Sequence, residues 1–186
     1  MVRAKAGPSV STFILAALVL LAIGCATDDN RLIGAASNGN TGALKALLGR
    51  GAEVNARDEN GQTALYHAAW KGRTDAVQVL LAAGAEVNAR NNAGGTALMG
   101  AAWTGRTEMA QRLIAKGADV NAKNSVGGTA LMIAVMQGHS DTVKTLLAAG
   151  ADLPVKNDRG MTALKLAVAS GHRDIAELLL NAGARE

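Results

Sequence analysis

Three histidines are the first residues of this chain to consider for metal binding or proton transfer. They are spread along the sequence, at His67, His139 and His172. A metal site needs several ligands that converge on one ion, and three single histidines that are 33 or more residues apart in the sequence do not provide them. We therefore interpret the histidines as structural residues, and we predict no metal and no cofactor.

The sequence lacks the patterns that mark other kinds of catalytic site. No serine lies in a Gly-x-Ser-x-Gly nucleophile motif. The glycine pair Gly94-Gly95 is not followed by the Lys-Ser/Thr that completes a phosphate-binding loop. Four recurrent acids fit the first turn of a helix, where they complement the helix dipole: Asp75, Glu108, Asp141 and Asp174. We expect no enzyme.

A fixed period organises most of the chain. The tripeptide Thr-Ala-Leu begins at Thr63, Thr96, Thr129 and Thr162, that is, every 33 positions without slippage. A glycine recurs with the same spacing and adds a fifth, earlier unit at Gly39. Such a period predicts a stack of similar small units rather than one compact core. Low aromatic content, 2% of residues, predicts a core of alanine, leucine and valine.

The unit from residue 61 to residue 92 shows the plan of one repeat. Residues 64–70 have a helical pattern, and Gly72 provides the break that follows a helix end. Thr74 is the expected N-cap of a second helix, which Gly84 ends. Residues 86–90 are expected to be extended and to lead through a turn into the next unit.

This plan resembles the ankyrin repeat family. The family signature T-P-L-H-x-A appears here as Thr63-Ala64-Leu65-Tyr66-His67-Ala68. The resemblance covers about residues 28–186 and implies an all-α repeat solenoid with β-hairpin-like loops between units. It divides a domain at 26–186 into about five repeats, approximately 28–57, 58–90, 91–123, 124–156 and 157–186. Alanine replaces the proline that would preset each helix start, which weakens each start slightly.

The N-terminal segment has the character of an export signal. Arg3 and Lys5 precede a nearly unbroken apolar run at 10–23. Because a membrane-spanning helix needs about 20 apolar residues, this shorter run fits a signal peptide. It ends in Gly24-Cys25, which resembles the bacterial lipobox, in which the cysteine is acylated. We predict a signal peptide at 1–25 and lipidation of Cys25; the alternative is ordinary cleavage after Ala26, which leaves a soluble periplasmic domain.

A stripe of large side chains follows the same period. Trp70, Trp103 and Met136 recur every 33 positions, and each ends the first helix of its repeat. By resemblance to ankyrin proteins, this position faces the concave surface beside the loop tips that contact partners. Tryptophan is enriched in binding hot spots, so the stripe is a candidate partner-binding site. The alternative is that each ring packs against the neighbouring repeat.

A ladder of cations also repeats with this period, in the loops. Its members are Arg57, Arg90, Lys123 and Lys156. The ladder either serves solubility or adds to partner binding. Together with the stripe, it would suit an acidic, partly apolar protein surface.

Two classes of function follow from these features. The first is a non-enzymatic module that binds a periplasmic protein through its concave face and loop tips and inhibits, protects or scaffolds it. The second is a lipid-anchored organising lipoprotein that contacts anionic lipid or cell-wall polymer. A net charge of +4 is too weak to predict nucleic-acid binding. We expect a monomer that meets the membrane only through its lipid anchor, on the outer membrane because Ala26 rather than aspartate follows Cys25.

Overall fold

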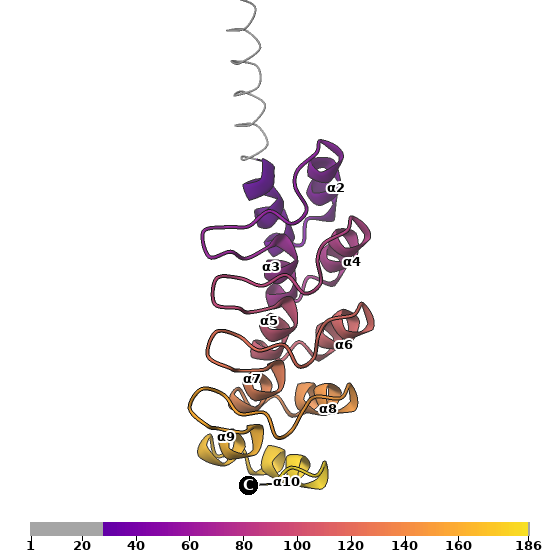
Figure 1. Ribbon diagram of the computed structural model, residues 1–186. Helices are drawn as coiled ribbons and strands as arrows, with labels where there is room; N and C mark the ends of the chain where they lie inside the picture. Colours follow the sequence, from indigo (N-terminus) through magenta and orange to yellow (C-terminus); the bar gives the residue numbers. More distant parts are fainter. Residues whose placement is uncertain (1–27, 186) are drawn as a thin grey trace, which may run out of the picture.

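The computed structural model describes residues 28–185 as a stack of helical pairs (Figure 1). The predicted signal peptide at 1–25 and its Cys25 lie outside the described residues. The first helix occupies 28–38 within the described part of the chain. The other helices follow in pairs: α2 (Thr41–Gly49), then α3 (Ala64–Lys71) with α4 (Thr74–Ala82), α5 (Ala97–Trp103) with α6 (Thr107–Ala115), α7 (Ala130–Met136) with α8 (Ser140–Ala148), and α9 (Ala163–Ala169) with α10 (Arg173–Asn181).

The helices form two rows that run along the stack. Figure 1 shows α3, α5, α7 and α9 in one inner row, α2, α4, α6, α8 and α10 in an outer row, and long loops that project beside the inner row. Each inner helix packs on the next inner helix and on the outer helix of its own pair. Contacts of this kind join only neighbouring units, so the all-α repeat solenoid is confirmed. In the described residues the loops contain no strand and one isolated bridge, between Arg57 and Thr63.

The repeated threonines mark the starts of the inner helices. In each case the Oγ accepts a hydrogen bond from the backbone amide three residues later, at 3.3–3.4 Å. These hydroxyls satisfy one of the free donors at a helix start, and the side chains that supply them are buried: Thr63, Thr96, Thr129 and Thr162.

Of the outer helices, α2 is capped by Asn40, whereas α4, α6, α8 and α10 begin without a side-chain cap, and the prediction that Thr74 is an N-cap is wrong. Thr74 is already helical, and Arg73 occupies the cap position with no side-chain capping bond. The Arg73 side chain turns to the preceding repeat instead, where Nε donates to the Ser37 carbonyl at 3.1 Å.

Small side chains allow the inner helices to approach closely. Ala68, Ala69, Ala101 and Ala102 are fully buried between successive repeats. Leucines fill the space between the two rows, and the fully buried ones include Leu65, Leu98 and Leu131. This alanine and leucine core agrees with the low aromatic content.

A ladder of asparagines ties each loop to the next repeat. Asn88 Oδ1 accepts from the Asp119 amide at 2.8 Å, and its Nδ2 donates to the Gly117 carbonyl at 3.0 Å. Asn121 makes the equivalent bonds one repeat later, at 2.9 and 3.2 Å. Pro154, which has no side-chain amide, takes this position in the next loop. The loops are therefore held as one series with the helices behind them.

Candidate functional site

The stripe predicted from the sequence lies on one face of the inner row. Trp70 and Trp103 stack on each other across two repeats, with ring centroids 6.2 Å apart and an interplanar angle of 25°. Tyr66 extends the cluster, with its ring 5.8 Å from that of Trp70. Trp103 and Met136 are each 47% exposed, whereas Trp70 is half-buried.

The two interpretations of the stripe therefore apply to different residues. Trp70 packs between Tyr66 and Trp103 and supports the stack. Trp103 rests on Trp70 with one side and leaves almost half of its surface open to solvent. A large aromatic side chain held in place and partly exposed can bury much apolar area in a complex at a low cost in conformational entropy.

The cationic ladder lies in the loops, and all four of its side chains are exposed: Arg57, Arg90, Lys123 and Lys156. The Arg57 guanidinium donates to the Gly61 carbonyl at 3.2 Å and also to the Arg90 carbonyl in the next loop. Arg90 donates in the same way to the Lys123 carbonyl. Each arginine thus joins its own loop to the following one. This structural role was not predicted from the sequence, and the role of the ladder in partner binding stays a prediction.

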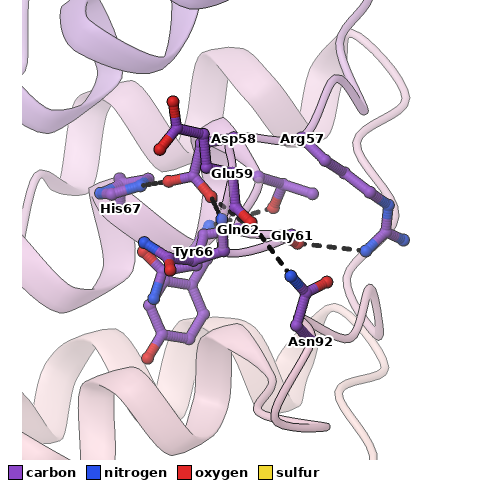
Figure 2. A network of polar contacts seen from close by, with 10 residues as sticks. Arg57, Asp58, Glu59, Gly61, Gln62, Tyr66, His67 and Asn92 are labelled. Carbon is purple, nitrogen blue, oxygen red and sulfur yellow. Dashed lines mark hydrogen bonds and ion pairs between the residues drawn. The ribbon is translucent and has the colours of Figure 1, made fainter.

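A polar network connects the first of these loops to α3 (Figure 2). The His67 ring donates from Nε2 to Asp58 Oδ2 at 2.8 Å. The other carboxylate oxygen of Asp58 accepts from the amides of Asn60 and Gln62, both at 2.9 Å. Partial burial works to raise the pKa of Asp58, but the hydrogen bonds outweigh it, so this pKa lies below its ordinary value.

The His67–Asp58 pair has the form of a catalytic orienting pair but lacks a reacting group. The hollow beside it is lined by Asn30, Arg57, Asp58, Glu59 and Asn60, so none of its lining side chains is a hydroxyl or a thiol. The Tyr66 ring meets the His67 imidazole edge to face at 6.1 Å. Burial raises the pKa of the Tyr66 phenol, and the Asp58 carboxylate raises it further. We conclude that the pair positions the loop against the helix.

Comparison with known protein families identifies the repeats. A family model that describes three copies of the ankyrin repeat matches residues 32–124 and again residues 98–185. The chain belongs to the ankyrin repeat family. No curated protein shows significant similarity to the chain. Ankyrin repeats are generally non-catalytic modules that bind other proteins, so the exposed surface of the inner helices and the loop tips is the site to consider.

The two other histidines contact backbone carbonyls of the stripe. His139 Nε2 donates to the Trp103 carbonyl at 3.1 Å, and His172 Nε2 lies 3.4 Å from the Met136 carbonyl. Both contacts fix the backbone at a residue of the stripe. Over residues 28–185, no three His, Cys, Asp or Glu side chains are grouped as a metal site would require. The same part of the chain has no helix that is long and apolar enough to span a membrane.

Sequence reasoning missed three features of this ankyrin domain. The asparagine ladder was visible as a residue repeated every 33 positions, at Asn55, Asn88 and Asn121. The arginine contacts had the same periodic signal but no sign of their acceptors, which are backbone carbonyls. The pairing of His67 with Asp58 had no signal, because the equivalent positions in the next repeat are Gly100 and Asn91.

Proposed function

We propose that this ankyrin repeat protein is a non-enzymatic binding module of the bacterial envelope. It binds a periplasmic protein through the inner face, which we define as the exposed surface of α3, α5, α7 and α9 with the loop tips beside them. Through this contact it inhibits, protects or scaffolds its partner. Two things support this: the general role of ankyrin repeats and the signal peptide that the sequence predicts at residues 1–25.

The observation that carries the proposal is the stacked tryptophan pair. Trp103, one of the two tryptophans in the chain, is 47% exposed. It is held against Trp70 at 6.2 Å, and Met136 continues the exposed row one repeat later. Ordered, partly exposed aromatic side chains are typical of the residues that dominate protein interfaces.

The envelope location rests on residues 1–25. We propose that Cys25 is lipidated after export and that the repeats lie on the periplasmic side, at the outer membrane. Incorporation of labelled palmitate by the wild type, and its loss in Cys25→Ser, would support lipidation. Export of an unlabelled, soluble mature protein would instead favour ordinary cleavage after Ala26.

Cross-linking in the intact envelope tests the binding function. The full chain with a C-terminal affinity tag is expressed in cells, cross-linked and recovered beside Trp70→Ala/Trp103→Ala. Loss of both rings is expected to weaken a dedicated interface by about 2 kcal/mol or more, the size of a hot spot. One protein that is captured by the wild type and lost by the double variant supports the proposal.

A matched control guards against simple unfolding. Leu178→Ala changes a partly buried side chain of the outer helix α10, away from the inner face. Thermal melts followed by circular dichroism show whether each variant remains folded. Equal capture by the wild type and a folded double tryptophan variant would contradict the proposal and leave the organising lipoprotein as the better hypothesis.

A further inference from the structure

Large apolar side chains are exposed at the centre of the inner face. Trp103 lies at the end of α5 and Met136 at the end of α7, each 47% exposed. Val126, 59% exposed, lies at the tip of the loop that leads into α7. We call these three residues the central patch. They come from two successive repeats, whose loops project on the side of the inner helices (Figure 1).

The charge in the loops beside the central patch is mostly positive. The loop segments 89–95 and 122–128 contain Arg90 and Lys123 and no carboxylate. The loop after them contains Lys156 and Arg159 with one carboxylate, Asp158, and the loop before them contains Arg57 with Asp58 and Glu59. A carboxylate of a partner is therefore attracted to the last three loops and disfavoured at the first.

The loops that present these cations are fixed before any partner binds. The Ser125 amide donates to the Ala93 carbonyl at 2.9 Å, and the Asp158 amide donates to the Val126 carbonyl at 3.1 Å. Arg90 adds its bond to the Lys123 carbonyl. A backbone that is already ordered loses little conformational entropy on binding, so the loops present the patch and its cations from a fixed frame.

We propose that the partner binds the central patch through an amphipathic segment with acidic flanks. Its apolar side chains cover Trp103, Val126 and Met136, and its carboxylates face Arg90 and Lys123. This inference rests on the proposed function, because it specifies the chemistry of the partner for the same face. It also predicts that the repeat junction between α5 and α7, rather than the whole face, sets the affinity.

Two synthetic peptides test the inference. Both are fluorescein-labelled amphipathic helices of equal length with the same leucine face, and one has glutamates where the other has lysines. Binding to the purified full chain is measured by fluorescence anisotropy at about 0.15 M salt, where the Debye length is about 8 Å. The glutamate peptide is expected to bind at least tenfold more tightly, and Trp103→Ala is expected to reduce that binding at least tenfold.

Two exposed lysines provide the matched control. Lys123→Glu is expected to abolish the preference for the glutamate peptide, whereas Lys45→Glu, the same change on the outer helix α2, is expected to change it less than twofold. Equal effects of the two substitutions, tighter binding of the lysine peptide, or no binding of either peptide would overturn the inference. If the tryptophan-dependent capture in the envelope succeeds while these peptide results fail, the inference falls and the proposed function stands.

Discussion

The asparagine ladder makes a quantitative prediction about how the repeats are joined. Asn88→Ala removes a 2.8 Å bond to the Asp119 amide and a 3.0 Å bond to the Gly117 carbonyl. A protein hydrogen bond contributes about 0.5–1.5 kcal/mol net. Because Asn88 is exposed, water partly replaces both bonds in the variant. For two such bonds we therefore expect the free energy of unfolding to fall by about 1 kcal/mol or slightly more.

Urea denaturation followed by tryptophan fluorescence measures this loss of stability at the junction of the two repeats that Asn88 joins. Asn88 links its loop to the following repeat, and Trp70 and Trp103 stack across the same pair of repeats. With a denaturant slope of about 2 kcal/mol per molar urea, the midpoint should fall by about 0.5 M or slightly more. Gln111→Ala, an exposed change on α6, should alter stability by less than about 0.5 kcal/mol. If the two variants have the same midpoint, the ladder does not join the repeats.

Three further predictions concern single residues. Asp58→Asn should be less stable than the wild type at neutral pH. The pKa of Asp58 in the folded state is below 3.8. Its pairing with His67 therefore stabilises the fold above about pH 4, and this stabilisation is lost as the pH falls below that value. Urea midpoints from about pH 2 to pH 7 should therefore converge at low pH, and a constant difference would contradict the cause. Gly100→Ala should raise the melting temperature, because a helical glycine costs about 0.5–1 kcal/mol and the new Cβ would meet only ordinary van der Waals contacts, at 3.6 Å. Gly105→Ala should lower the melting temperature, because φ is +66° and the Cβ would lie 2.6 Å from a histidine ring. The opposite order of melting temperatures would refute this reasoning. Thr96→Ala should cost about 1 kcal/mol through loss of the helix cap, while Thr96→Ser should retain most of the stability in the same melts.

The fold could be predicted because its determinants are periodic. Thr63 and its equivalents cap the inner helices at every repeat, and Gly72 and Gly105 take the positive φ expected at the helix ends. A residue that recurs every 33 positions occupies the same place in the backbone plan of each unit, so one unit predicts the helices of the others. Thr74 was misplaced because the sequence does not show that Arg73, one residue earlier, reaches back to the preceding repeat.

The candidate site was predictable only in part. The positions of Trp70, Trp103 and Met136 followed from the period, but their different exposures did not. Trp70 is covered because Tyr66 and Trp103 lie on either side of it, and those contacts join residues in different turns and repeats. The sequence likewise placed Arg57 and Arg90 correctly in the loops. It could not show that their side chains bind carbonyls of the next loop.

The departures from periodicity separate binding from folding in this molecule. Positions at which a residue recurs in successive repeats, such as Thr96 and Asn88, make contacts that support the fold: Thr96 caps its helix and Asn88 joins its loop to the next repeat. An exposed residue that breaks the pattern is a candidate for a role other than folding. Val126 is such a residue, since the equivalent loop position is occupied by Ala93 in the previous repeat, and its side chain is 59% exposed. Val126 is exposed on the inner face together with Trp103 and Met136, and a partner that covered these three side chains would remove their apolar surface from water, which favours association.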